Sequence, residues 1–210
     1  MLAELAIHKG LKLMSEDVVF VAARRTAIGS FQGQFAPVKS PQMGAAVIDA
    51  VMKDSGVDGA DVSEVIMGCV LPAGTGQAPA RQAALGAGLP IGAGATTINK
   101  VCGSGLKAAM LASDLINAGS ADVVVAGGME SMTNAPYLMD RGLRMGHVQA
   151  LDHMFYDGLQ NPYDGNMMGG FAEKCAAKYS FSREDQDEFS KTSVERAMAA
   201  MASGAFDDEI

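Results

Sequence analysis

Tryptophan is absent from the 210 residues, and long apolar runs and basic surface patterns are missing as well. No apolar stretch approaches the roughly 20 residues that a membrane-spanning helix needs. Acidic residues outnumber basic ones by 24 to 16, which gives a net charge of -8, and no basic stripe carries interleaved aromatic residues. These absences argue against a membrane protein and against nucleic-acid binding.

Cysteine is scarce too, because the chain contains only Cys69, Cys102 and Cys175. They are widely separated, with no CxxC pair or Cys/His cluster of metal-ligand spacing, so the sequence predicts no metal site. The opening residues lack the apolar core of a signal peptide. We therefore expect a cytoplasmic protein, and we interpret residues 1–14 as an N-terminal extension.

Short apolar runs of strand length alternate with helical patterns along the next part of the chain. This alternation predicts an α/β fold, with a parallel or mixed sheet covered on both faces and functional sites at the carboxyl ends of the strands. The expected strands are 18–22, 62–70, 96–101 and 122–126, and the expected helices are 44–55, 78–87 and one that starts near 103.

The amino-acid composition changes after Glu130. Met, Gly, Asn, Pro and Tyr dominate as far as Gly170, which favours a loop-rich insertion, and helices are expected at 171–179 and 182–203. Ser182 with Asp185 resembles a capping box at the start of the last helix, and Gly204 a stop at its end. We therefore divide the chain into the extension, a core half at 15–130, and a loop domain with following helices at 131–210.

Cys102 is the strongest candidate for chemistry, because it lies between an expected strand and an expected helix. The positive end of a helix dipole favours the thiolate form of such a cysteine. The following Gly103 leaves room for an incoming acyl group, and backbone N–H groups at this turn could hold an oxyanion. The alternative interpretation is a small buried cysteine at a tight turn. Cys69 and Cys175 are predicted to be inert packing residues.

Several separated segments resemble the thiolase family. The string NKVCGSGLKA at 99–108 and the string AGGMESM at 126–132 resemble the sequence around the acylated cysteine of thiolases. RRTAIG at 24–29 and GQAPARQ at 76–82 resemble two further blocks of the family. The resemblance extends from about Val18 to Ile210.

The resemblance implies a thiolase-like fold in which two βαβαβαββ halves pack together and a loop domain is inserted in the first. This chain would hold the first half with its inserted helical/loop domain, with the second half absent. In thiolases the second half supplies a histidine that activates the nucleophile, a cysteine that moves the α-proton, and a water held by asparagine. The resemblance also implies a homodimer or homotetramer, or a second chain that supplies the C-terminal half.

The implied activity is that of an acetyl-CoA C-acyltransferase of fatty acid metabolism. Cys102 would carry the acyl group for Claisen condensation of two acetyl-CoA, or for thiolysis of 3-ketoacyl-CoA. Coenzyme A thioesters would be substrates, with no cofactor and no metal. Leu159 and Met168 match the segment that packs on the pantetheine and acyl part of coenzyme A, although filling a gap in the core would explain them equally well.

One position departs from the family pattern, and two alternative functions remain open. The position before Met168 is often histidine in the family, whereas here it is Met167, which leaves the acyl-chain preference undecided. His8, His147 and His153 are interpreted as surface or structural residues. A ketoacyl synthase would share the fold, but the Cys-Gly-Ser-Gly-Leu string argues against it. A catalytically inactive thiolase fragment, or a split-gene subunit that only assembles, is the second rival.

Overall fold

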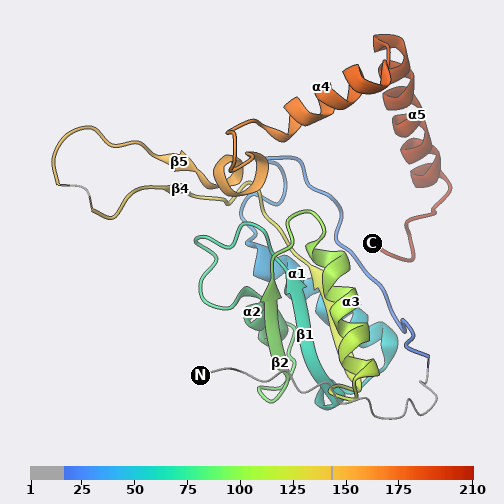
Figure 1. The fold of residues 1–210 in the computed structure, drawn as a ribbon. Helices are drawn as coiled ribbons and strands as arrows, with labels where there is room; N and C mark the ends of the chain where they lie inside the picture. Colours follow the sequence, from blue (N-terminus) through green and yellow to red (C-terminus); the bar gives the residue numbers. More distant parts are fainter. Residues whose placement is uncertain (1–16, 143) are drawn as a thin grey trace.

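The computed structural model describes residues 17–142 and 144–210 (Figure 1). The predicted extension at 1–14 lies outside these residues, as does His8. Helices and strands alternate through the first part of the described chain, as the sequence predicts. The elements are α1 (Ser40–Ser55), η1 (Gly59–Asp61), β1 (Val62–Gly68), α2 (Pro79–Gly86), β2 (Gly94–Ile98), α3 (Ser104–Asn117) and β3 (Val123–Gly128).

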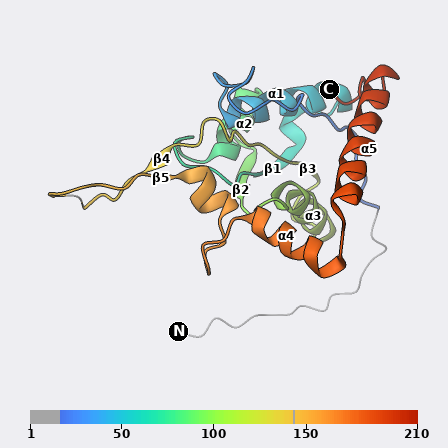
Figure 2. The same ribbon diagram turned by 90° about the horizontal axis from the view of Figure 1, so that it is seen from above.

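The three strands form a parallel sheet in the order β2-β1-β3. Gly68, the last residue of β1, is paired with Ile98 on one side and with Gly128 on the other, so the carboxyl ends of all three strands lie level. Helices α1 and α2 lie on one face of the sheet and α3 lies on the other (Figure 2). The predicted α/β fold is therefore confirmed.

The core lies between the sheet and the pair α1 and α2. β1 is buried along most of its length, because it is the central strand and is covered on both faces. Small residues let the two helices approach closely, and Gly44 on α1 faces Ala83 on α2 and Met129 after β3. The largest fully buried side chains are those of Ile48, Met67, Val65, Cys69 and Ser40.

The predicted strand at 18–22 is wrong in this structure. These residues are extended but belong to no strand, because their backbone pairs with none of the strands β1, β2 and β3. Val19, Phe20 and Val21 are 66–86% exposed, so the two-sided burial that their apolar pattern predicts is missing. The segment instead lines an apolar groove with residues of α1, α3 and β3.

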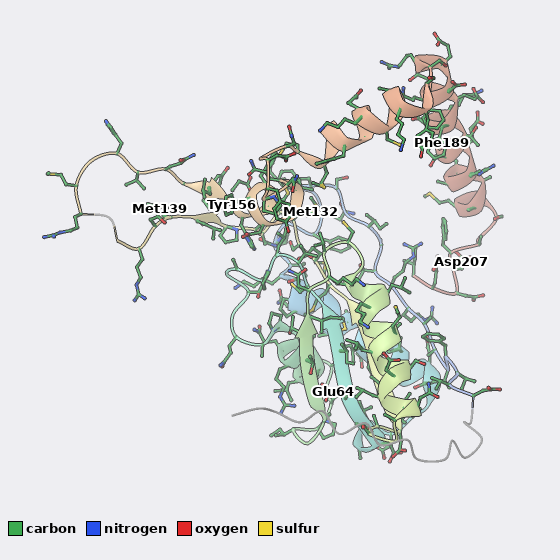
Figure 3. All side chains as sticks on the ribbon, in the orientation of Figure 1. Glu64, Met132, Met139, Tyr156, Phe189 and Asp207 are labelled. Atoms are coloured by element: carbon green, nitrogen blue, oxygen red, sulfur yellow. The ribbon has the colours of Figure 1, made fainter. Side chains whose placement is uncertain are left out.

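The chain after β3 leaves the sheet and returns to it. A two-stranded antiparallel ribbon, β4 (Tyr137–Leu138) with β5 (Leu151–Asp152), projects from the core, and Met139 lies along it (Figure 3). A single π-helical segment, η2 (Met154–Leu159), follows, and then α4 (Met168–Tyr179) and α5 (Arg183–Ala202). In the described ranges, no helix combines the length and apolar character needed to cross a membrane.

The ends of α5 follow the predicted signals. The Ser182 hydroxyl accepts the N–H of Asp185, and the Asp185 carboxylate accepts the N–H of Ser182, which completes the capping box. Gly204 follows the helix in the left-handed conformation. The chain then reaches the core again, where Arg25 donates from its backbone N–H to Glu209 O at 2.8 Å and from its guanidinium to Glu209 Oε1 at 2.9 Å.

Candidate acyl-transfer site

Cys102 lies in a tightly bonded turn between β2 and α3. Val101 has φ 48°, a left-handed conformation that is strained for a β-branched residue. The Asn99 side chain holds this conformation by accepting the Val101 N–H at 2.8 Å. The Ser104 hydroxyl donates to Val101 O at 2.6 Å and accepts the Lys100 N–H at 2.8 Å. The turn therefore fixes the backbone on both sides of Cys102, and such stored strain is typical of functional sites.

Glycines at the strand ends let the first turn of α3 rest directly on the sheet. A Cβ atom added to Gly68 would lie 2.5 Å from Ser104 Cβ and 2.8 Å from the Ser104 carbonyl carbon. A Cβ atom added to Gly128 would lie 3.5 Å from Gly105 Cα. The sequence places glycine where the helix start approaches β1 and β3, and this contact determines where Cys102 sits.

Cys102 itself is exposed and directly precedes Gly103, the N-cap residue of the 14-residue α3. The sulfur is therefore at the positive end of the helix dipole, as predicted. The Gly103 N–H donates to Lys100 O at 3.1 Å and is engaged within the turn. An oxyanion at Gly103 would have to share or replace that bond, so the oxyanion role of Gly103 stays a prediction.

An apolar cleft of about 410 Å³ opens beside Cys102. Its walls come from the loops that follow all three strands and from η2, because parallel strands bring their carboxyl ends to the same edge. Glu130 is the one carboxylate among the residues that line it. The apolar wall is formed chiefly by Val70, Leu71, Val101, Met132, Met154 and Leu159.

The two predicted substrate-contact residues are separated in the structure. Leu159 lies in the wall of the cleft, as expected for a residue that would contact an acyl group. Met168 begins α4, is 46% exposed and is not among the residues that line this cleft. The structure therefore brings Cys102 and Leu159 together, whereas a role for Met168 stays a prediction.

Glu130 organises the loop that follows β1, and the sequence analysis did not identify it. Its carboxylate accepts the N–H of Val70 at 2.7 Å and that of Leu71 at 3.0 Å. The Cys69 thiol points at the same carboxylate, with Sγ 3.6 Å from Oε1. Burial, with the adjacent charge of Glu130, raises the pKa of Cys69 to about 12. Cys69 is therefore a buried neutral thiol, which confirms its predicted packing role.

Cys175 differs from the prediction, because it is exposed on α4 rather than packed. The reason is that α4 has no buried residue among those described, so a helical position alone does not bury a thiol there. Across the described ranges, no group of three His, Cys, Asp or Glu side chains gathers as metal ligands would.

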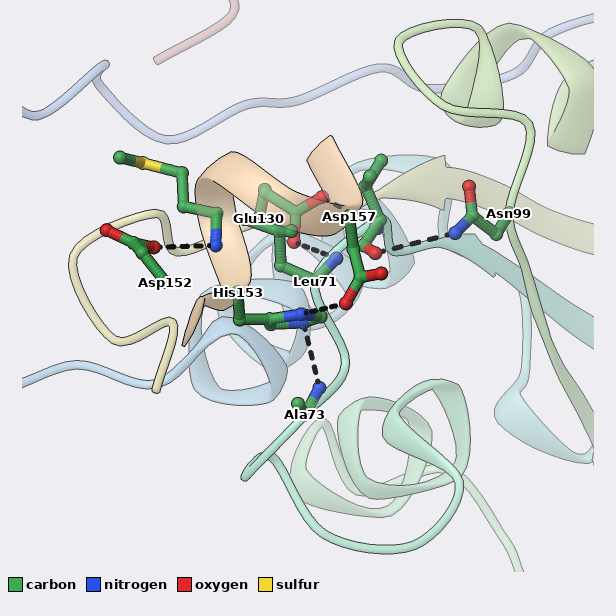
Figure 4. Close-up of polar contacts among 9 residues, drawn as sticks. Leu71, Ala73, Asn99, Glu130, Asp152, His153 and Asp157 are labelled. Atoms are coloured by element: carbon green, nitrogen blue, oxygen red, sulfur yellow. Dashed lines mark hydrogen bonds and ion pairs between the residues drawn. The ribbon is translucent and has the colours of Figure 1, made fainter. Parts of the chain in front are cut away.

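No described histidine lines the cleft beside Cys102. His147 is exposed on the connection between β4 and β5. His153 is 4% exposed, and both of its ring nitrogens are occupied, one by Asp157 and the other by the N–H of Ala73 (Figure 4). As placed here, neither residue can take a proton from Cys102, in agreement with the structural interpretation of His153.

The described residues thus form a parallel α/β sheet that presents an exposed cysteine at a strained strand-to-helix turn, beside an apolar cleft. The family model described as "Thiolase, N-terminal domain" matches residues 18–210. The chain therefore belongs to the thiolase family, and it corresponds to the N-terminal half of a thiolase.

Curated relatives are similar to this chain over most of its length. The chain is 52% identical over 93% of its length to the acetyl-CoA acetyltransferase of Pseudomonas aeruginosa, and 53% identical over 92% to that of Chromobacterium violaceum. It is 47% identical over 97% of its length to acetyl-CoA acetyltransferase 2 of Arabidopsis thaliana. The chain spans 50–51% of the length of these relatives.

Proposed function

We propose that this chain forms an acyl-enzyme on Cys102 and serves as the nucleophile-bearing half of an acyl-CoA acyltransferase. The observation that carries the proposal is the position of Cys102, exposed at the N-terminus of α3 and open to an apolar cleft of about 410 Å³. Three relatives that are 52–53% identical to this chain over the matched residues are named acetyl-CoA acetyltransferase, which supports acetyl-CoA as the acyl donor.

In the proposed first step the Cys102 thiolate attacks the carbonyl carbon of an acyl-CoA. The bond from that carbon to the sulfur of coenzyme A breaks, coenzyme A leaves and takes up a proton, and the acyl group remains as a thioester on Cys102. The enolate of a second acetyl-CoA then attacks the carbonyl carbon of this thioester in a Claisen condensation, the bond from that carbon to the Cys102 sulfur breaks, and Cys102 leaves as a thiolate while 3-ketoacyl-CoA is released. Thiolysis of a 3-ketoacyl-CoA is the same sequence in reverse, and either direction belongs to fatty acid metabolism in the cytoplasm.

The second step needs groups that the described residues do not bring to the cleft. In thiolases a histidine, a second cysteine and an asparagine-held water come from the C-terminal half, and we propose that the same groups complete this site. The outer face of α3 supports a covering partner, because Leu106 and Met110 are 72% and 51% exposed. Apolar side chains on one helix face favour burial against another protein surface. A C-terminal half, within a homodimer or homotetramer or on a second chain, would supply this covering surface.

The same exposed face favours one alternative, a catalytically inactive thiolase fragment or a split-gene subunit that only assembles. Intact mass after incubation with acetyl-CoA separates the two proposals. The purified chain is measured alone and with any co-purifying polypeptide, beside Cys102→Ser as control. An acetyl adduct that is lost in Cys102→Ser supports the acyltransferase, with or without the second polypeptide. No adduct under either condition rejects it and leaves the assembly role.

A further inference from the structure

His153 contacts three segments around the cleft: the residues before β4, η2 and the loop after β1. Its backbone N–H donates to Pro136 O at 3.1 Å, next to the start of β4. Its ring Nδ1 lies 2.6 Å from Asp157 Oδ2 on η2, and its ring Nε2 lies 3.4 Å from the N of Ala73 in the loop after β1. His153 is 4% exposed, whereas the side chain of its partner Asp157 is 44% exposed.

The partners determine how the imidazole is protonated. The Ala73 N–H can only donate, so Nε2 must accept with its lone pair. In the neutral ring the proton is then on Nδ1, which donates it to the Asp157 carboxylate. One side chain therefore accepts from the loop after β1 and donates to η2. A smaller or apolar residue at this position could satisfy neither group.

The two segments that His153 joins carry much of the wall that faces Cys102. Leu71 comes from the loop after β1, and Met154, Gly158 and Leu159 come from η2. The segments also touch directly, because a Cβ atom on Gly158 would lie 3.3 Å from Leu71 Cδ2. Glu130 fixes the other end of the same loop through the N–H groups of Val70 and Leu71.

We propose that His153 is a positioning residue for acyl transfer, which holds η2 against the loop after β1 and so fixes the wall opposite Cys102. This inference rests on the proposed function, because it assigns the wall to an acyl group. A shift of the wall of the order of 1 Å is enough to slow a positioned reaction by up to about a hundredfold. The reactivity of Cys102 towards a small reagent does not depend on that wall.

The test compares His153→Ala with His147→Ala, a matched control on the exposed connection between β4 and β5. The rate of acetyl transfer from acetyl-CoA to Cys102 is expected to fall about tenfold or more in His153→Ala, whereas alkylation of Cys102 by iodoacetamide stays within about twofold. His147→Ala is expected to match the wild type in both reactions. An unchanged rate of acetyl transfer in His153→Ala would overturn the proposal.

Hydrogen exchange measured by mass spectrometry tests the bridge itself, on unacylated protein. His153→Ala is expected to speed exchange by roughly fivefold in both 70–76 and 154–160, as the loss of one net hydrogen bond predicts. His153→Gln, whose amide oxygen can reach the Nε2 position, is expected to restore protection at 70–76, whereas His153→Asn is not.

The two measurements separate two kinds of failure. A wild-type chain that takes no acetyl group refutes the proposed function whatever His153 does. If the wild-type chain is acylated but hydrogen exchange in either segment of His153→Ala is unchanged, only the role of His153 is refuted and the proposed function stands. Faster exchange throughout the sheet, rather than in the two joined segments, would also contradict the proposal, because it would mean general destabilisation.

Discussion

Substitution of Gly68 by alanine tests whether the close approach of α3 to β1 positions the nucleophile. The new Cβ would lie 2.5 Å from Ser104 Cβ and 2.8 Å from the Ser104 carbonyl carbon, where ordinary contacts are 3.4–4 Å. Neither atom is the free end of a flexible side chain, so the first turn of α3 must move. Overpacking of this kind costs about 3 kcal/mol, at the upper end of its usual range. For a chain of this size, that loss lowers Tm by about 6–12 °C.

Thermal unfolding followed by circular dichroism measures the stability, and acetyl transfer from acetyl-CoA measures the site. We expect Gly68→Ala to unfold at lower temperature and to acylate Cys102 more slowly. Gly105→Ala is the steric control, because its Cβ would approach other atoms no closer than 3.9 Å. It should keep or slightly raise the Tm, since alanine favours a helix over glycine. Equal Tm and equal acylation for Gly68→Ala and the wild type would refute the positioning argument.

Three further predictions concern the thiol of Cys69, the carboxylate beside it and the outer face of α3. The folded-state pKa of Cys69, about 12, lies above its ordinary value of 9.0, so the unfolded chain loses this proton first. The free energy of unfolding should therefore decline from about pH 9 towards pH 12, and denaturant titrations of Cys69→Ala should lack that part of the slope. Glu130→Gln removes a charge that disfavours the thiolate, so thiolate absorbance should show a lower Cys69 pKa that stays above 9.0, because burial is the larger cause. A pKa unchanged by this substitution would exclude the electrostatic contribution. Leu106→Glu changes a side chain that is 72% exposed, so Tm should change by the equivalent of about 0.5 kcal/mol or less while self-association falls in sedimentation experiments. Association that survives Leu106→Glu would place the interface elsewhere.

The strands and helices that were predicted correctly are those whose local patterns agree with their final packing. The apolar run that became β1 is central and buried, so its side chains have the environment that their pattern indicates. α5 has almost no apolar face towards the core, yet its ends were predicted, because Ser182, Asp185 and Gly204 act through bonds within a few residues. Local chemistry is readable without knowledge of the fold.

The strand predicted at 18–22 failed for the opposite reason. Its apolar pattern is strong, but a strand also needs backbone hydrogen bonds to a neighbouring strand, and residues 18–22 pair with none of β1, β2 and β3. Pairing is a property of the whole sheet, and no local pattern reports which segments will pair. Met168 is likewise placed by the fold rather than by its local pattern, because it begins α4 outside the residues that line the cleft, and its substrate contact stays a prediction.

The nucleophile of the candidate site could be predicted from the sequence, but the residues that position the surrounding loops could not. Cys102 stands out because a strand, a glycine and a helix surround it in sequence. Glu130 and His153 act over separations of 60 and 80 residues, on Val70 and Ala73. No spacing rule links such partners, although the position of Glu130 directly after a strand end is a signal that could have drawn attention to it.

The central claim is that Cys102 holds an acyl group as a thioester that remains competent for transfer. The most direct measurement is to isolate the chain after incubation with acetyl-CoA, map the modified peptide, and then add free coenzyme A. The account predicts one acetyl group per chain, on Cys102, that hydroxylamine releases and that coenzyme A recovers as acetyl-CoA, with none in Cys102→Ser. An acetyl group that resists hydroxylamine, maps to a lysine or persists in Cys102→Ser would contradict it.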